Sequence, residues 1–165
     1  MSDNPTGADN QQERPSPDWV VGFVDGEGCF FVGINRQPSM TVGWQVLPEF
    51  RVVQHERDVI ILEQLREFFG CGQITRNHGD RKELRIRGLK QLSEQVVPFF
   101  ESHQLRTVKR SSFDRFAGVI RRMNRGDHLT TEGLESIRKL AAGMNRGARN
   151  PQRPYAGRPV AQTGG

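Results

Sequence analysis

The chain has 165 residues, 35% of them hydrophobic and 26% charged, which is enough for one compact domain or two very small ones and excludes a large multidomain enzyme. Lys and Arg number 24 against 19 Asp and Glu, a formal net charge of +5, and this balance favours a polyanionic partner such as nucleic acid over a basic surface without a partner. No apolar stretch approaches the roughly 20 residues of a membrane span, and two cysteines, Cys29 and Cys71, cannot form a disulfide framework or a four-cysteine zinc site.

The composition of the chain changes at both ends. Residues 1–15 are polar and include Pro and Gly, which predicts a disordered lead-in. This start has no basic flank and no apolar stretch, so it is unlike a signal peptide and favours a protein that is not secreted. Residues 145–165 contain four Arg and no acid among several Pro and Gly, so we expect a flexible basic tail that is either solvated or lies along phosphates. The ordered domain is expected over residues 16–144.

The first predicted helix begins at residues 16–18, because Ser-Pro-Asp supplies an N-cap, a first-turn proline and a first-turn acid. It ends at the Gly-Glu-Gly turn of residues 26–28. Two strands with alternating apolar residues are predicted over 29–35 and 43–53, and Pro48 indicates a strand edge or a bulge. The core-facing side chains of these strands are Phe30, Val32, Ile34, Trp44, Val46, Phe50 and Val52.

The remaining elements alternate in the same way. An amphipathic helix is predicted over 57–69, with Gly70 as its stop signal. Two further strands are predicted over 73–77 and 82–87, joined by a turn around Gly79 and Asp80. Further helices are expected over 89–101, 109–123 and 131–143. The order α-β-β-α-β-β-α, followed by helices, predicts an α+β domain with a four-stranded antiparallel sheet.

The outward face of this sheet is polar and mixed in charge. By the period of two, it carries Phe31, Gly33, Asn35, Gln45, Leu47, Glu49, Arg51, Thr75, Asn77, Glu83, Arg85 and Arg87. Arg, Asn, Gln, Thr and Glu are side chains that read donor and acceptor patterns on base edges in the major groove. An ordinary solvated sheet face has a similar composition, so this pattern alone leaves both interpretations open.

Residues 19–28 form the most informative segment. Gly22 and Gly26 lie four residues apart on the predicted helix, which leaves one face bare enough for close approach of another helix. Glu27 follows between two glycines, and an accessible carboxylate beside backbone carbonyls suits a hard cation such as Mg²⁺. The alternative is a core helix with a glycine C-cap and an exposed acid in the turn.

Residues 20–28, Val-Val-Gly-Phe-Val-Asp-Gly-Glu-Gly, resemble the LAGLIDADG motif of the homing endonucleases. The resemblance continues over roughly residues 17–146, and both order and spacing agree. The further segments that resemble the family are 48–54, 68–72, 98–100, 105–110 and 131–145.

This resemblance implies an αββαββα core whose sheet forms a saddle on the DNA major groove. In the family the motif helices pack together at the centre and place one acid in each active site. Members with one motif are homodimers, and a second motif is absent here, because residues 116–120 are followed by Arg121 and Arg122 where acids are needed. The resemblance thus implies a homodimer that cuts both strands of a long pseudo-palindromic DNA site, with its interface at Val21, Gly22, Asp25 and Gly26.

The family's functional residues transfer to particular positions. The resemblance implies that Glu27 and the Gly26 carbonyl bind Mg²⁺, or Mn²⁺ in its place, and that Asp25 is more structural. Gln54 aligns with a polar residue at the periphery of the active site, and Lys109 with a basic residue near the scissile phosphate. The side chains expected on DNA are Phe31, Gly33, Asn35, Gln45, Arg51, Thr75, Asn77, Glu83, Arg85 and Arg87. One departure is Asp58, which stands where some members have a base, with Arg57 next to it.

Two alternatives remain at this point. A member of the same fold can bind without cutting, as a regulator or as a maturase that helps an intron fold. A basic α+β interaction domain without nuclease chemistry is the other. On the endonuclease interpretation we expect a DNA-associated protein of the cytoplasm or an organelle matrix, with no membrane contact and no small-molecule substrate.

Overall fold

The computed structural model describes residues 14–144. The predicted basic tail and nearly all of the predicted lead-in lie outside these residues. Arg14, inside the predicted lead-in, donates a hydrogen bond from Nη2 to the carbonyl of Phe68 at 3.2 Å, and its guanidinium carbon lies 5.2 Å from the centre of the Phe68 ring. The last residues of that segment therefore contact the body of the domain.

Helix α1 spans Pro17–Glu27 and begins as predicted. The hydroxyl of Ser16 accepts the backbone N–H of Trp19 at 3.3 Å and so satisfies one of the free donors at the helix start. At the other end, Gly28 donates its N–H to the carbonyl of Val24 and leads directly into the first strand. A Cβ at Gly28 would lie 2.6 Å from Cγ1 of Val24, so this junction accepts only glycine without a shift.

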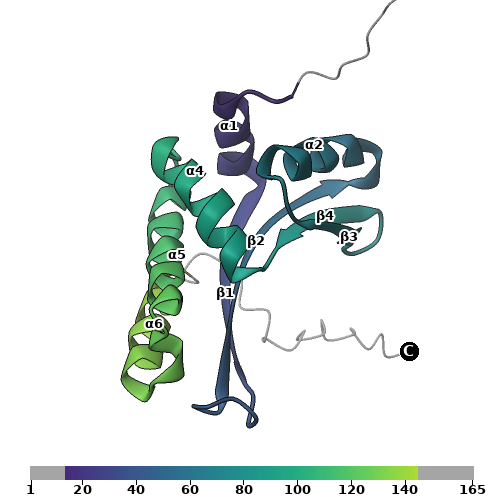
Figure 1. The fold of residues 1–165 in the computed structure, drawn as a ribbon. Helices are drawn as coiled ribbons and strands as arrows, with labels where there is room; N and C mark the ends of the chain where they lie inside the picture. Colours follow the sequence, from purple (N-terminus) through teal and green to yellow (C-terminus); the bar gives the residue numbers. More distant parts are fainter. Residues whose placement is uncertain (1–13, 145–165) are drawn as a thin grey trace, which may run out of the picture.

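The sheet has four antiparallel strands in the order β1-β2-β4-β3. Strands β1 (Gly28–Arg36) and β2 (Trp44–His55) form a long hairpin that extends beyond the other strands (Figure 1). Only Phe50–His55 of β2 also pairs with β4, so Pro48 lies where β2 has one neighbour. The prediction of a strand edge at Pro48 is therefore confirmed, because proline cannot donate to a second neighbour.

The next part of the chain forms a helix and the two strands of the other half of the sheet. A 3₁₀ turn at Glu56–Asp58 leads into α2, Val59–Phe69, which ends at Gly70 with a left-handed φ of 69°. Strands β3 (Gln73–Arg76) and β4 (Arg81–Ile86) follow. Arg87 and Asn77 thus lie one residue beyond the strands to which they were assigned.

The rest of the described chain is helical. The single helix predicted over 89–101 is instead α3 (Leu89–Gln91), a π-helical segment (Leu92–Val96) and α4 (Val97–Ser102). Pro98 has no N–H to continue a regular ladder, and this interruption is a feature that apolar periodicity does not predict. Helix α5 spans Lys109–Asn124, a 3₁₀ turn spans Asp127–Leu129, and α6 spans Thr131–Met144.

Phenylalanine rings join the sheet to the helices. The Phe30 ring of β1 lies 5.2 Å from Phe50 of β2, 5.5 Å from Phe100 of α4 and 5.3 Å from Phe116 of α5. All four side chains are buried. The predicted core face of β1 and β2 is confirmed, and the opposite face of the sheet is left to solvent. Within residues 14–144, no helix has the length and apolar character needed to cross a bilayer.

Candidate active site and nucleic-acid interface

The candidate active site is the C-terminal end of α1. Glu27 is the last residue of the helix and is exposed, as is Gly26 before it. The last turn contains no basic residue, although it holds two carboxylates and the free carbonyls of a helix end. Negative charge at this end of the helix dipole is unfavourable by itself, so the site favours a cation.

Lys109, the first residue of α5, supplies one such cation. Its Nζ donates hydrogen bonds of 2.9 Å to the carbonyls of Val24 and Asp25. Burial lowers the pKa of the Lys109 ammonium below its ordinary value, against opposing interactions with the nearby Cys29, Asp25 and Glu27 side chains. An ammonium has three donors. The contacts of residues 14–144 use two of them, so one N–H of Lys109 remains for another acceptor. The prediction of Glu27 and Lys109 in one site therefore agrees with the geometry.

Asp25 fixes the loop that brings Lys109 to the helix end. Its carboxylate accepts the backbone N–H of Arg106 at 2.7 Å, and the backbone N–H and hydroxyl of Thr107 at 3.2 and 2.7 Å. Burial alone would raise the pKa of the Asp25 carboxyl, but these hydrogen bonds and the Lys109 charge outweigh it and lower the pKa below 3.8. The more structural role expected for Asp25 is visible in these contacts.

Gln54 lies at the same end of the sheet as the junction between α1 and β1. It is two residues beyond Val52, which pairs with Gly28, and it stands opposite Lys82 of β4. By the alternation of the strand, its side chain lies on the helix side and is half-buried. This placement is at the edge of the site, as the resemblance implies, and its catalytic role remains a prediction.

The donor set at the end of α1 fits a magnesium ion only as part of a larger site. The described residues contain no group of three or more His, Cys, Asp or Glu side chains that could hold a metal ion. Mg²⁺ in phosphate-transfer sites is held by one or two carboxylates together with phosphate oxygens and water. The exposed Glu27 carboxylate, the Gly26 carbonyl and the phosphates of a bound nucleic acid match that requirement. Metal binding remains a prediction.

The polar face of the sheet is continuous, as expected. The strand register places Asn35 opposite Gln45, Gly33 opposite Leu47 and Phe31 opposite Glu49. It also places Arg85 between Arg51 of β2 and Gln73 of β3, and Thr75 opposite Glu83. The predicted DNA-contacting side chains thus lie on one face, and contact with DNA remains a prediction for each of them.

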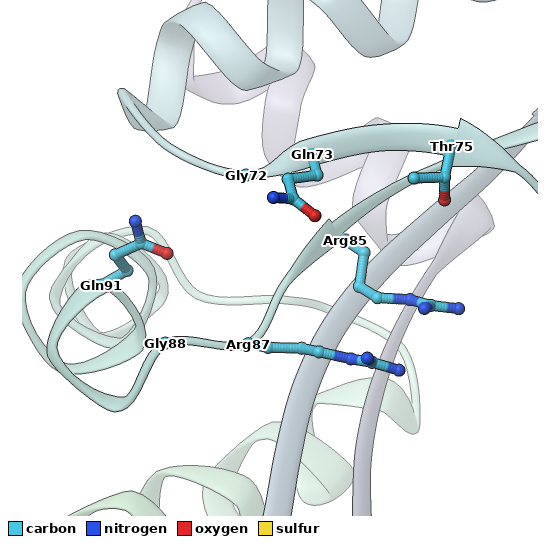
Figure 2. Close-up of a pocket in the computed structure, with 7 residues that line it drawn as sticks. All are labelled: Gly72, Gln73, Thr75, Arg85, Arg87, Gly88 and Gln91. Carbon is cyan, nitrogen blue, oxygen red and sulfur yellow. The ribbon is translucent and has the colours of Figure 1, made fainter.

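Part of this face forms a hollow of about 360 Å³, lined by residues from β3, from β4 and the turn after it, and by the last residue of α3. Figure 2 shows Arg85 and Arg87 extending in the same direction, with the amides of Gln73 and Gln91 on the other side of the hollow. The hollow is polar and open, which suits a flat or edge-on hydrogen-bonding partner.

Two carboxylates of this face are not free for solvent. Glu83, expected to contact DNA, is only 1% exposed, and Glu49 is 5% exposed. Arginine and asparagine side chains of the same face cover both of them. Glu83 lies on the outward side of the sheet, as the strand alternation predicts, but its neighbours bury it beneath the surface of the face.

The surface of α1 that contains Gly22 and Gly26 is exposed. A Cβ built at Gly22 or Gly26 would meet nothing within 4 Å, so no contact within residues 14–144 requires glycine at either position. The Trp19 and Phe23 rings stack 4.9 Å apart on the same helix, and Trp19 is 41% exposed. Val21 was expected at an interface, but it is 9% exposed and belongs mainly to the core of its own chain.

Comparison with known proteins adds the family. The family model for the LAGLIDADG endonuclease matches residues 20–120. The chain belongs to the LAGLIDADG endonuclease family. In the crystal structure of the homing endonuclease I-TnaI, 91% of the chain is matched by 82% of this one, at 55% identity and a TM-score of 0.78. I-SmaMI, solved on an uncleaved DNA target with calcium ions, is 32% identical; 84% of this chain matches 47% of that one, with a TM-score of 0.80.

A probable intron-encoded endonuclease of Neurospora crassa is 31% identical over 134 residues, which are 80% of this chain and 30% of that protein. The chain therefore spans less than a third of the length of this relative, and about half of I-SmaMI. The αββαββα core expected from the resemblance is confirmed.

Three features of the LAGLIDADG site were not predicted from the sequence. Thr107 completes the cap on Asp25, Cys29 lies close enough to act on the Lys109 charge, and Glu49 gathers arginines. The alternation of β2 did place Glu49 on the outward face. Its burial depends on the long side chains of neighbouring strands, which only the pairing register brings together.

Proposed function

We propose that this chain is a site-specific homing endonuclease that acts as a homodimer and hydrolyses phosphodiester bonds in both strands of double-stranded DNA. The observation that carries this proposal is the Lys109 ammonium, held on the carbonyls of the α1 end next to the exposed Glu27 carboxylate. In a member of the LAGLIDADG endonuclease family, this arrangement supplies a carboxylate and a positively charged side chain at one end of the motif helix.

The chemistry divides between the two side chains. Glu27 and the Gly26 carbonyl would hold Mg²⁺, or Mn²⁺ in its place, and the bound ion would supply Lewis-acid chemistry at the scissile phosphate. Lys109 directs its remaining N–H toward the phosphate and offsets the negative charge that develops in the transition state. Gln54 orients solvent at the edge of the site. The Asp25 cap keeps Lys109 in register with the helix end.

Two copies of the chain suit this function. The described chain contributes one Glu27 and one exposed α1 surface, and double-strand cleavage needs chemistry on each strand. This chain covers 47% of I-SmaMI, so a second copy would supply as much protein as the other part of that longer enzyme. We place the seam along Gly22, Gly26 and the exposed edge of Trp19, where the chain leaves room for a second helix.

The test separates binding from cutting. A DNA site is first selected from a randomised duplex library with the wild-type chain, and single-turnover cleavage is then measured on that site with saturating protein. We expect Mg²⁺-dependent cleavage of both strands by the wild type. Glu27→Gln keeps the side-chain volume and removes the charge, so we expect binding close to wild type and cleavage lower by several orders of magnitude.

The outcomes distinguish the alternatives. Selection of a site without cleavage would support a regulator or a maturase of the same fold, and failure to select any site would support a basic interaction domain. A Glu27→Gln rate within about tenfold of wild type, which is about 1.4 kcal/mol of barrier, would remove Glu27 from the mechanism. Glu63→Gln is the matched control, since it removes one exposed carboxylate on α2.

A further inference from the structure

Two buried carboxylates lie in the middle of the sheet face that the proposed function assigns to DNA. Glu49 comes from β2 and Glu83 from β4, and their exposed fractions are 5% and 1%. Charged groups at such burial are costly unless they are paired and hydrogen-bonded. A surface that only needed to be solvated, or only to attract phosphates, would not place acids there.

Glu49 gathers three arginines around one carboxylate. Its Oε2 accepts a hydrogen bond of 2.6 Å from Nε of Arg87. Its Oε1 lies 3.4 Å from Nε of Arg85 and 3.6 Å from Nη1 of Arg51. These arginines come from β2, from β4 and from the residue that follows β4, so a single side chain links two strands across the face.

Glu83 continues the same network. Its Oε1 pairs with Nη2 of Arg85, and its Oε2 accepts a hydrogen bond of 2.6 Å from Nδ2 of Asn77. Arg85 is thus held between two carboxylates, and its side chain is only 29% exposed. Nη2 of Arg85 pairs with Glu83, and its buried Nε faces Glu49 at 3.4 Å without forming a hydrogen bond, so the guanidinium lies between the two carboxylates inside the network.

Arg87 differs from Arg85 in which of its donors are used. Its contact with Glu49 uses Nε, and its side chain is 59% exposed. Among the contacts of residues 14–144, the terminal nitrogens Nη1 and Nη2 have no partner and so remain as a parallel pair of donors at the edge of the hollow (Figure 2). A bidentate arginine matches the O6 and N7 acceptors of guanine in the major groove.

The charges of this network nearly cancel. Three arginines carry +3 and two glutamates carry −2, which leaves +1 over the network of Arg51, Arg85, Arg87, Glu49 and Glu83. Non-specific affinity for DNA depends on the number of phosphates that are neutralised. Because two glutamates pair with the arginines of the same face, the non-specific affinity for DNA is lower, but the arginine donors are held in fixed positions.

We propose that Glu49 is a positioning residue for base recognition, which holds Arg87 so that its Nη1 and Nη2 read one guanine in each half-site. The proposal rests on the proposed function, because it needs DNA on this face of the sheet. Arg87 is the residue that contacts the base, and Glu49 acts through it by fixing the guanidinium and by cancelling positive charge beneath the DNA.

The experiment uses the full chain and a randomised duplex library, with Ca²⁺ in place of Mg²⁺ so that binding is measured without cutting. For the wild type we expect one guanine position per half-site at which other bases weaken binding about 10- to 100-fold. Arg87→Lys keeps the charge and loses the bidentate pair, and we expect it to flatten this position to within about threefold while affinity for random-sequence duplex changes little.

Glu49→Gln keeps the volume of the side chain and removes the charge that fixes Arg87. We expect the same guanine position to flatten, and affinity for random-sequence duplex to rise with a steeper dependence on salt. In the Glu49→Gln, Arg87→Lys double variant, base preference should be no flatter than in Arg87→Lys alone, since both changes act on one contact. Glu63→Gln changes the net charge equally on exposed α2 and should leave the preference intact.

The outcomes separate this inference from the proposed function. If the wild type selects a site but Arg87→Lys retains every base preference, the inference is overturned and the endonuclease proposal stands. Retention of the guanine preference in a folded Glu49→Gln overturns the role of Glu49. If the wild type selects no site at all, the proposed function fails. Because Arg87 is well exposed, Arg87→Lys will fold and keeps the test decisive even if Glu49→Gln does not.

Discussion

Lys109 shows how one residue joins distant parts of the chain. Its ammonium takes the place of a basic residue in the last turn of α1, and it comes from the start of α5. Because burial lowers its pKa, the folded chain releases this proton at a lower pH than the unfolded chain does. The contribution of Lys109 to stability therefore rises as pH increases through the window between its lowered pKa and the ordinary 10.5.

The contribution of Asp25 to stability likewise rises with pH, but it does so in the acid range, which gives a prediction for Asp25→Asn. The folded state lowers the pKa of this carboxyl below 3.8, so its stabilising effect is complete above that value and is lost as pH falls through the lowered pKa. Hydrogen bonds to a charged group contribute about 1.5–3 kcal/mol. We expect Asp25→Asn to lower the free energy of unfolding, measured by urea denaturation, by about 1–3 kcal/mol at neutral pH. At a pH far below 3.8 the effect of the substitution should be much smaller.

Asp114→Asn is the control for this prediction, because Asp114 is an exposed carboxylate on α5. It should change the unfolding free energy by about 0.5 kcal/mol or less at neutral pH. A difference between wild type and Asp25→Asn that stays constant from neutral to strongly acidic pH would show that the carboxylate charge does not hold the loop at Arg106 and Thr107.

The candidate active-site residues could be predicted from the sequence more readily than the residues that support them. The motif pattern and the family resemblance identify Glu27 and Lys109, since a short motif and a basic turn are local in sequence. Thr107 and Glu49 act through contacts with residues 82 and 38 positions away. Such contacts follow from the docking of α5 and the register of β4, which the alternation of a single strand does not determine.

At the scale of elements, α1 has two surfaces with different requirements. Gly28 is needed by the chain itself, because a Cβ there would collide with Val24. Gly22 has open space, and its buried neighbours Val20, Val21 and Val24 face the core. A glycine inside a helix costs about 0.5–1 kcal/mol relative to alanine. Within residues 14–144 nothing requires glycine at position 22, and the second helix of the proposed homodimer would account for it.

Gly22 therefore distinguishes folding from association. We expect Gly22→Leu to leave the helical content of the monomer intact and to weaken the homodimer by about 1–3 kcal/mol or more, because the second helix is forced away. Sedimentation across a concentration series measures the dissociation constant, and circular dichroism checks the fold. Ala142→Leu adds the same bulk at an exposed position of α6 and should not change association. Equal dissociation constants for wild type and Gly22→Leu would place the seam elsewhere.

The elements themselves were predicted well where periodicity is strong. The bounds of α1, α2 and the β1–β2 hairpin agree with the sequence within a few residues, because capping residues and alternating apolar side chains mark them locally. The helical stretch around Pro98 was predicted as one helix and is three segments. Its apolar residues keep a helical pattern, and the pattern does not report how the ladder passes the proline.

At the scale of the whole molecule, the two α1 ends of a homodimer would lie close together at the seam. Each would bring an exposed Glu27 to the shared centre, where the two negative carboxylates would repel each other. Lys109 is different, because its ammonium is tied to the carbonyls of its own α1. In the proposed dimer, the two Glu27 carboxylates thus lie together at the centre, whereas each Lys109 serves the cleavage of one DNA strand.

This division predicts the behaviour of a mixed dimer of one wild-type chain and one Lys109→Met chain. The methionine keeps much of the aliphatic volume and removes the cation, so its half-site should lose transition-state stabilisation while the other half-site keeps it. We expect the mixed dimer, purified with two different affinity tags, to convert a supercoiled plasmid that carries the selected site mainly to the nicked circle. Strand-specific labels should place the nick on one strand.

Wild-type dimers with the same two tags should give linear product, and the Lys109→Met homodimer should bind the site and cut both strands slowly. Linear product from the mixed dimer at the wild-type rate would show that Lys109 is not assigned to one strand, and would return its role to closing the end of α1.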